Sequence, residues 1–203
     1  CGSPLTLAAY SIEGRSSKDF EKTLNFLVSN QKDVHNLLTK YTDACFLYLR
    51  RQVQSGADVI QIFDSWANLL TKEGLIEYSF NYINALISAL KLDPVTKNIP
   101  VIVFARNPKC NIEGLINTSA DCISLFWSMN DLNFEVAKNK VAIQGNLDPK
   151  ILLESDETIK RETYKILERF KEYPGYIFNL GHGITPDISP DKIKYLTNIV
   201  REY

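Results

Sequence analysis

Five short apolar runs, four to six residues long and rich in β-branched side chains, constrain what this chain can fold into. They lack the polar alternation of a half-exposed strand, which favours strands covered on both faces, as in parallel sheets. Segments with helical periodicity separate them, and such crossovers make the strands parallel. The runs span residues 59–63, 100–105, 122–126, 141–144 and 176–179.

The helical segments carry their own start signals. Phe20, Leu24, Leu27 and Val28 share one helical face, and the spacing from Val34 to Leu49 predicts a second amphipathic helix. Ser155, followed by two acidic residues, predicts an N-cap. Ser189-Pro190 predicts another, with proline at the first helical position.

Two architectures fit this order, an open doubly wound sheet and part of a (β/α)8 barrel. No Gly-x-Gly-x-x-Gly and no Walker-type loop follows a strand, which weakens the nucleotide-binding version of the open sheet. A full barrel needs about 250 residues. With five expected strands in 203 residues and a start at Cys1, we expect one partial domain, residues 1–203, that lacks the beginning of a barrel.

Composition excludes several function classes. The 23 Lys and Arg against 24 Asp and Glu argue against a nucleic-acid or polybasic membrane surface. No run approaches the about 20 apolar residues of a membrane helix. Without export signals, we expect a cytoplasmic protein with reduced thiols. The four cysteines show no spacing typical of a zinc site, and we expect no metal; they are Cys1, Cys45, Cys110 and Cys122.

Polar and aromatic residues follow each predicted strand. In parallel α/β folds the reactive groups gather at the carboxyl ends of the strands, so these positions predict a ligand pocket at that rim. The segments are Asp64-Ser65-Trp66, Arg106-Asn107, Trp127-Ser128, Gly145-Asn146-Leu147-Asp148-Pro149 and Gly181-His182-Gly183.

Four side chains admit both a functional and a structural interpretation. His182 is flanked by glycines, which favours close approach to a ligand over core packing. The alternative that His182 is an ordinary turn residue without a binding role stays open. His35, in an amphipathic helix, is better explained as a solvated or helix-flanking residue. Ser65 lacks a nucleophile-elbow context and is expected to be a hydrogen-bonding hydroxyl. From composition alone, Tyr10 is best explained as a packed aromatic residue whose hydroxyl forms a polar tip.

At these same positions the chain resembles the uroporphyrinogen decarboxylase family. Gly2-Ser3-Pro4-Leu5-Thr6 with Tyr10 and Glu13-Gly14 is similar to that family's G-[AS]-P-W-T…Y…E-G segment. Gln61–Ala67 is similar to its Q-x-F-[DE]-S-W-A-G segment. Residues 144–149 and 179–183 match its Q-G-N-L-D-P and N-L-G-H-G segments without a substitution. The resemblance covers the whole chain but only the later part of the family's sequence.

The resemblance implies an α/β fold, a (β/α)8 TIM barrel truncated to about its last five strands, in a protein that acts as a homodimer without a cofactor. The implied reaction removes the carboxyl groups of the four acetate side chains of uroporphyrinogen III and gives coproporphyrinogen III. Tyr10, Ser65 and His182 are implied to contact this substrate at one mouth of the barrel, because hydroxyl and imidazole groups donate hydrogen bonds to carboxylates. Phe63 either lines the macrocycle pocket or packs in the core.

The departures from the family pattern shape a further expectation. The family's R-Q-A-G-R-Y segment and the aspartate that faces the pyrrole nitrogens would lie upstream of residue 1, so no catalytic residue is assigned here. The first three strands are missing too, apart from a tail of the third around Gly2. We therefore expect the 203-residue chain alone to be poorly soluble or partly unfolded, and inactive. Inside the match, Leu5 replaces Trp, Asn68 replaces Gly, and Phe126 stands where Asp is usual.

Two alternatives stay open. One is a non-catalytic remnant or split-gene product that binds porphyrinogen or a partner chain; the coding DNA upstream of Cys1 would distinguish it from the enzyme. The other is a corrinoid-linked methyltransferase of the same superfamily. That protein would need a zinc-binding His-x-Cys, but Ile184 and Leu37 stand two residues after the two histidines.

Overall fold

The computed structural model describes residues 1–203 except 16, 18, 107–111 and 130–133. Each of the five predicted strands is present, and their hydrogen-bonded order is β1-β2-β3-β4-β5. The chain forms two compact units, residues 1–123 and 124–203. The strands are β1 (Ile60–Asp64), β2 (Val101–Ala105), β3 (Cys122–Ser124), β4 (Ala142–Gln144) and β5 (Tyr176–Ile177).

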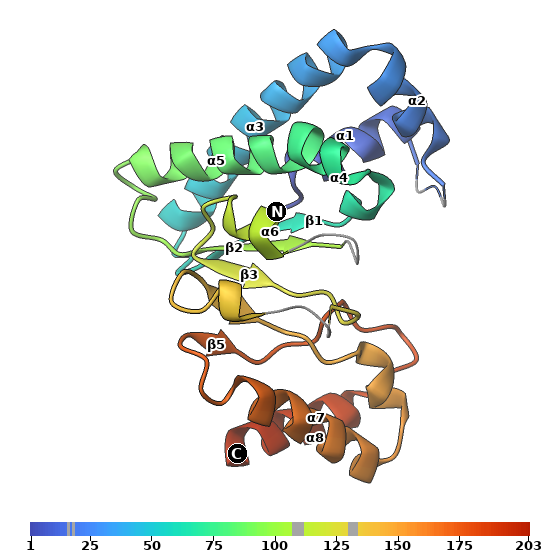
Figure 1. The fold of residues 1–203 in the computed structure, drawn as a ribbon, viewed down its shortest axis with the longest axis vertical. Helices are drawn as coiled ribbons and strands as arrows, with labels where there is room; N and C mark the ends of the chain where they lie inside the picture. The colour runs from blue at the N-terminus through green and yellow to red at the C-terminus, as the bar shows by residue number, and fades with distance from the viewer. Residues whose placement is uncertain (16, 18, 107–111, 130–133) are drawn as a thin grey trace. The chain divides into compact units, whose positions relative to one another are not determined.

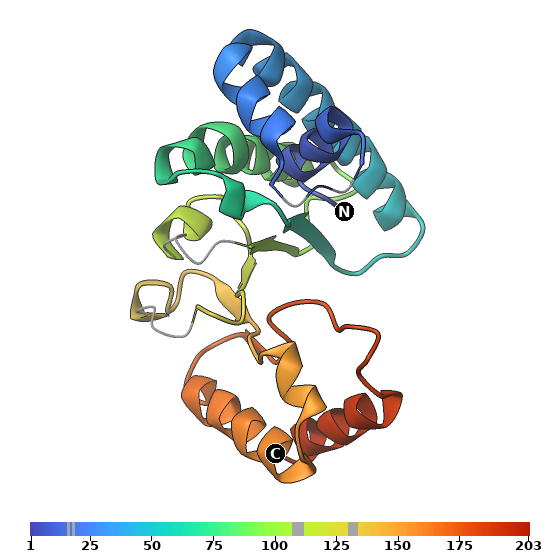
Figure 2. The same cartoon turned by 90° about the vertical axis from the view of Figure 1, so that its right-hand side faces the viewer.

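Helices α1, α3 and α5 of the first unit cover one side of strands β1 and β2 (Figure 1). The predicted helices over residues 20–28 and 34–49 are found as α2 and α3, and α3 packs against α5 (Figures 1 and 2). The bounds are α1 (Pro4–Glu13), α2 (Glu21–Ser29), α3 (Gln31–Gln54), η1 (Ala67–Leu69), α4 (Lys72–Leu75), the π-helical turn η2 (Ile76–Phe80), α5 (Asn81–Leu92) and α6 (Ile112–Ile116).

Helix α1 was not predicted, although its sequence carries a start signal. Ser3 is its N-cap, with the side-chain oxygen accepting a hydrogen bond from the Thr6 N–H, and Pro4 occupies the first turn. The helix ends at Gly14, whose φ of 72° is left-handed and suits glycine. Just before α1, Gly2 forms a parallel bridge with Phe63, so the residues around Gly2 run along β1 as the resemblance implies.

The core of the first unit lies between β1, β2 and the helices. Strands β1 and β2 are parallel, in register from Ile60 opposite Val101 to Asp64 opposite Ala105. Leu5, at the position where the family has Trp, is only 2% exposed, so this departure keeps an apolar side chain in the core. The fully buried apolar residues include Ile62, Val103, Ile83, Leu86, Ile87 and Leu90.

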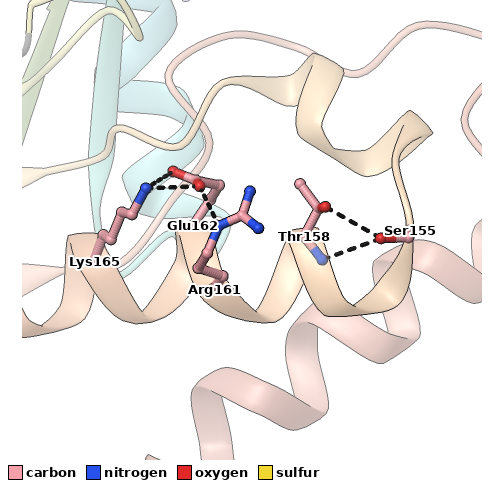
Figure 3. A network of polar contacts seen from close by, with 5 residues as sticks. All are labelled: Ser155, Thr158, Arg161, Glu162 and Lys165. Atoms are coloured by element: carbon pink, nitrogen blue, oxygen red, sulfur yellow. Dashed lines mark hydrogen bonds and ion pairs between the residues drawn. The ribbon is translucent and has the colours of Figure 1, made fainter.

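The second unit pairs β4 with β5 in parallel and packs helix α7 (Asp156–Phe170) against α8 (Pro190–Glu202), as Figures 1 and 2 show. Both predicted N-caps are confirmed: Ser155 accepts a hydrogen bond from the Thr158 N–H and Ser189 from the Asp191 N–H. Figure 3 shows the cap at Ser155. Further along α7 in the same view, Glu162 accepts hydrogen bonds from Arg161 and Lys165. Two 3-10 turns complete the unit, η3 (Phe134–Val136) and η4 (Pro149–Leu153).

Among the described residues, no helix is long and apolar enough to cross a membrane. In the same part of the chain, no group of three or more His, Cys, Asp or Glu side chains could hold a metal ion. Of the four cysteines, Cys110 lies outside the described residues, and the other three are free thiols.

Candidate functional site

The carboxyl end of β1 has one buried and one accessible face, whereas β2 is buried along its whole length. Phe63 lies opposite Phe104 and Asp64 opposite Ala105. Side chains alternate along a strand, so Phe63 and Asp64 point to opposite faces. Phe63 is 42% exposed whereas Asp64 is 0% exposed. The Phe63 ring therefore lies on the accessible face of β1, where pocket lining and not core packing is the better of its two predicted roles.

Asp64 is the centre of a buried hydroxyl network. Its Oδ1 accepts hydrogen bonds from Ser3 Oγ at 2.7 Å and Thr6 Oγ1 at 3.4 Å, and its Oδ2 accepts one from Ser79 Oγ. Burial raises the pKa of the Asp64 carboxyl, and the three hydroxyl donors oppose that rise. Because Ser3 caps α1 and Ser79 lies in η2, this carboxyl joins the end of β1 to two helical segments.

The same network fixes the backbone of Ser65. The Ser65 N–H donates to Thr6 Oγ1 at 3.0 Å, and Thr6 Oγ1 in turn lies 3.2 Å from the Phe63 carbonyl oxygen, to which it can donate. Thr6 and Ser65 belong to separate sequence motifs, so these bonds bring the start of α1 to the end of β1. The predicted site residue Ser65 is partly exposed at this point.

Tyr10 joins this group through an aromatic cluster. Its ring lies 6.0 Å from the Trp66 ring at 86°, an edge-to-face geometry, and 6.3 Å from the Phe20 ring. Phe20 is 0% exposed and its ring lies 4.3 Å from Trp66, whereas Tyr10 is 43% exposed. The structure thus brings Tyr10 next to Trp66, the residue after Ser65, and leaves the tyrosine accessible.

Arg106 was noted in the sequence only as part of a strand-end segment. It directly follows β2, and its N–H donates to the Asp64 carbonyl oxygen at 3.0 Å. The guanidinium carbon lies 5.8 Å from the centre of the Trp66 ring, within the range of a cation–π contact. The neighbouring candidate, Asn107, lies outside the described residues.

His182 lies in the second unit, on the loop after β5. The loop is anchored by the Gly181 N–H, which donates to the Leu147 carbonyl oxygen at 2.8 Å. His182 is exposed, and its ring lies 5.9 Å from the Phe126 ring at 82°. Phe126 stands where the family usually has Asp, so this strand end supplies an aromatic contact to the histidine.

The close packing of this loop requires a glycine. A Cβ atom on Gly181 would lie 2.4 Å from the Trp127 backbone nitrogen, whereas a Cβ on Gly183 would have nothing within 4 Å. The Phe126 carbonyl oxygen accepts a hydrogen bond at 3.2 Å from the side-chain amide of Asn146, which is 1% exposed. The loop bearing His182 is therefore set directly against the segment that follows β3.

The predicted site residues are thus placed separately: Tyr10 and Ser65 in the first unit and His182 in the second. Their convergence at one mouth of the barrel stays a prediction.

Two cavities of about 350 and 340 Å³ lie away from these three residues. The larger is lined by residues of the β5 loop and α8, and the smaller by residues around Gly2 and α3; the pocket expected at the strand ends stays a prediction too.

His35 has structural partners in the first unit. Its Nδ1 lies 2.7 Å from the Tyr82 hydroxyl and its Nε2 lies 3.4 Å from Glu77 Oε1. The ring is half-buried and stacks on Tyr78 at 5.5 Å. These contacts join α3 to η2 and α5, which explains His35 as a helix-flanking residue, the interpretation favoured from sequence.

The fold and these strand ends define a parallel α/β protein that places polar and aromatic side chains after its strands. Residues 1–203 match the pattern of the family described as uroporphyrinogen decarboxylase (URO-D). The chain belongs to that family. This confirms the predicted α/β class, which here contains about five strands of a (β/α)8 barrel.

Curated relatives can be aligned with the whole length of this chain. It is 39% identical over 204 residues to the uroporphyrinogen decarboxylase of Ruthia magnifica, covering 100% of this chain and 58% of that protein. It is 41% identical to the Hydrogenobaculum protein of the same name, covering 100% of this chain and 58% of that protein. It is 40% identical to the Aquifex aeolicus protein of that name, covering 100% of this chain and 59% of that protein. The chain therefore spans less than two thirds of the length of these relatives.

A solved structure supports the fold alone. A methyltransferase from Methanosarcina mazei superposes with a TM-score of 0.76 at 19% identity, covering 99% of this chain and 57% of that chain. At this identity, the likeness carries no argument about activity.

Proposed function

We propose that the protein containing this chain removes the carboxyl groups of the four acetate side chains of uroporphyrinogen III and forms coproporphyrinogen III. The observation that carries this proposal is the family match over all 203 residues, which includes the segments that bear Tyr10, Ser65 and His182. The alternative of a remnant that only binds porphyrinogen becomes an outcome of the test below.

Tyr10, Ser65 and His182 are proposed as substrate contacts. The exposure of Tyr10 and the partial exposure of Ser65, whose backbone is held by Thr6, support this role in the first unit. In the second unit, the exposed imidazole of His182 on an anchored loop supports it. Each group can donate a hydrogen bond to a carboxylate, and the substrate carries eight.

The proposed chemistry uses the substrate as its own electron acceptor. Loss of carbon dioxide from an acetate side chain leaves an electron pair, which the protonated pyrrole ring accepts to give an exocyclic methylene group. Protonation of that methylene carbon and release of the ring proton then give the methyl group and restore the pyrrole. The protein then contributes orientation of the acetate and electrostatic stabilisation of the cationic ring. The exposed Phe63 ring supplies an apolar surface suited to a macrocycle.

The test is anaerobic conversion of uroporphyrinogen by the protein as its gene encodes it, with products separated by chromatography. We expect Tyr10→Phe, Ser65→Ala and His182→Asn each to lower kcat/KM about 10- to 100-fold, because each removes a hydrogen bond to a charged group. Tyr48→Phe and His35→Asn are matched controls. Tyr48 is 56% exposed on α3, and the contacts of His35 are structural.

An unmodified protein that binds uroporphyrin but releases no coproporphyrinogen would support the remnant instead. Equal losses in the site and control variants would refute the assigned contacts while leaving the activity standing.

We further propose that the protein acts as a homodimer in the cytoplasm and that residues 1–203 form one partial domain. Sedimentation of the same preparation tests the dimer.

A further inference from the structure

The Thr6 hydroxyl lies where the start of α1 meets the end of β1. Thr6 is 4% exposed, and its Oγ1 accepts a hydrogen bond from the Ser65 N–H at 3.0 Å. The same oxygen lies 3.2 Å from the Phe63 carbonyl oxygen, 3.4 Å from Asp64 Oδ1 and 3.1 Å from Ser3 Oγ. A single buried oxygen atom therefore joins the backbone on both sides of Asp64 to the first turn of α1.

The hydrogen atoms of this network have few alternatives. A hydroxyl group donates one hydrogen bond and has two lone pairs that can accept. Ser3 Oγ lies 2.7 Å from Asp64 Oδ1 but 3.1 Å from Thr6 Oγ1, so the Ser3 hydrogen belongs to the carboxyl, which is the nearer acceptor. The Thr6 hydrogen then goes to a backbone or carboxyl acceptor, which leaves a lone pair of the same oxygen for the Ser65 N–H.

Buried partners hold the Thr6 hydroxyl in place. Asp64 and Ser3 are each 0% exposed, and Ser79 is 1% exposed. Asp64 accepts hydrogen bonds from both serines, and the Ser3 side chain also accepts one from the Thr6 N–H at 3.0 Å. Because these groups are shielded from water, breaking one of the bonds would leave a buried polar group unpaired. The position of Thr6 Oγ1 is therefore well defined.

The backbone and the side chain of Ser65 differ in their partners. The Ser65 N–H is bonded to Thr6 Oγ1, whereas the hydroxyl has no hydrogen-bond partner among the residues that the structure describes. Ser65 is partly exposed. A hydroxyl on a restrained backbone can still rotate about its Cα–Cβ bond, so it can donate a hydrogen bond to a ligand while its Cβ atom keeps its position.

We propose that Thr6 is a positioning residue, which fixes the backbone of Ser65 so that the Ser65 hydroxyl is held ready for a carboxylate of the substrate. The inference rests on the proposed function, because it takes the substrate contact of Ser65 from it. Thr6 acts through Ser65, since its own hydroxyl is buried and bonded to neighbouring groups of the chain. Such restraint matters because a displacement of about 1 Å can lower a rate by as much as about 100-fold.

The test is a double-mutant cycle that combines Thr6→Val with Ser65→Ala in the protein as its gene encodes it. Thr6→Val keeps the shape of the side chain and removes the acceptor of the Ser65 N–H, whereas Thr6→Ser keeps the oxygen and removes only a methyl group. The control is Thr42→Val, because Thr42 is 9% exposed and its hydroxyl donates to the Leu38 carbonyl oxygen within α3 at 2.9 Å. Each variant is measured for conversion of uroporphyrinogen, for binding of its oxidised form uroporphyrin by fluorescence quenching, and for urea unfolding.

We expect Thr6→Val to lower kcat/KM about 10-fold, and by no more than Ser65→Ala does. When residue 65 is already alanine, Thr6→Val should change kcat/KM by less than about 2-fold, because no hydroxyl is left to position. Thr6→Ser should keep most of the activity even where urea unfolding shows a loss of stability, and Thr42→Val should match the unmodified protein in kcat/KM. A merely structural role of Thr6 predicts instead that the two losses multiply and that activity follows stability.

One further measurement needs no substitution. The bond to Thr6 should slow hydrogen–deuterium exchange of the Ser65 amide in the unmodified protein, although Ser65 is partly exposed. Exchange as fast as that of an unprotected amide would refute the restraint, and it would do so even if Thr6→Val failed to fold.

The two proposals can fail separately. If the unmodified protein forms coproporphyrinogen and the losses of Thr6→Val and Ser65→Ala multiply, the role of Thr6 is refuted and the activity stands. If the protein binds uroporphyrin without turnover and Thr6→Val weakens binding only while Ser65 is present, the activity is refuted and the role of Thr6 stands. A fully active Ser65→Ala variant would refute the contact of Ser65 and the role of Thr6 with it, and so would a protein that neither binds nor converts the substrate.

Discussion

The two glycines that flank His182 give a sharp test of how this loop is packed. Gly181→Ala would place a Cβ atom 2.4 Å from the Trp127 backbone nitrogen and 2.5 Å from its Cα. Gly183→Ala adds the same methyl group two residues later, where nothing lies within 4 Å. Neither glycine has a left-handed φ, so the difference between the variants is one of space rather than backbone conformation.

The size of the effect follows from the overlap. Non-bonded carbon atoms pack best about 3.5–4.0 Å apart, so Gly181→Ala must move backbone by about 1 Å. Overpacking of this kind costs about 1–3 kcal/mol. The alanine also restricts the unfolded chain, which contributes less than about 1 kcal/mol in the opposite direction. Gly181→Ala should therefore lower the free energy of unfolding by about 1–3 kcal/mol, and Gly183→Ala should leave it unchanged or slightly raised.

Urea unfolding followed by tryptophan fluorescence measures this difference. Residues 1–203 contain two tryptophans, Trp66 and Trp127, so Trp66→Phe, together with replacement of any tryptophan elsewhere in the encoded protein, makes Trp127 the probe. Gly181→Ala should also shift the emission of Trp127 in the native state, because the new methyl group displaces its backbone. If both alanine variants unfold alike and the emission is unchanged, the close approach of Gly181 to Trp127 is refuted.

Three further predictions concern stability and reactivity. Burial raises the pKa of Asp64 above its usual 3.8, so the stability that this group contributes is complete below that value and is lost as pH rises through the folded pKa. The free energy of unfolding of the unmodified protein, minus that of Asp64→Asn, should therefore fall as the pH of the urea titration is raised above the usual pKa of 3.8. Ser155→Ala removes the α7 cap and should cost about 1 kcal/mol in thermal unfolding. Burial raises the pKa of Cys122 to about 12, so mass spectrometry should find it alkylated by iodoacetamide more than about 100-fold more slowly in the native protein than in urea.

Each of these predictions has a control or a contradicting result. For the pH dependence, Asp43→Asn changes an exposed carboxylate on α3 and should show no such trend, and a difference that rises with pH for Asp64→Asn would refute the raised pKa. For the cap, Ser155→Thr keeps a side-chain oxygen and should recover most of the loss. Rapid alkylation of native Cys122 would contradict its burial at 4% exposure.

Local signals in the sequence were sufficient for most of the secondary structure. The β-branched runs predicted all five strands, and serine caps placed the starts of α7 and α8. Helix α1 was missed even though Ser3-Pro4 is the same signal that marks α8 at Ser189-Pro190. Its sequence, PLTLAAYSIE, is apolar for most of its length and lacks the spaced apolar stripe on a polar background that predicts the other helices.

The site was less predictable, because its contacts join residues far apart in sequence. Ser3 and Asp64 are 61 positions apart, and no local pattern indicates that a carboxyl at a strand end will be buried under hydroxyl donors. The hydrogen bond from the Arg106 N–H to the Asp64 carbonyl oxygen depends on the β1–β2 register, which periodicity cannot supply. Motif resemblance predicts Ser65 and Tyr10 as substrate contacts, which stays a prediction, whereas only the pairing of the two strands places Arg106 next to the end of β1.

Neighbouring residues at the end of β1 have different roles, one in stability and one in the proposed substrate contact. Asp64 holds the start of α1 and η2 through hydroxyl donors, while Ser65, the next residue, is partly exposed. The two roles cannot exchange, since a one-residue slip would expose the carboxyl and bury the hydroxyl. A negative charge on the accessible side would also repel the carboxylates of the proposed substrate. Burying Asp64 therefore joins the end of β1 to α1 and η2 and removes a carboxylate from the accessible side, which is compatible with the proposed binding of an anion there.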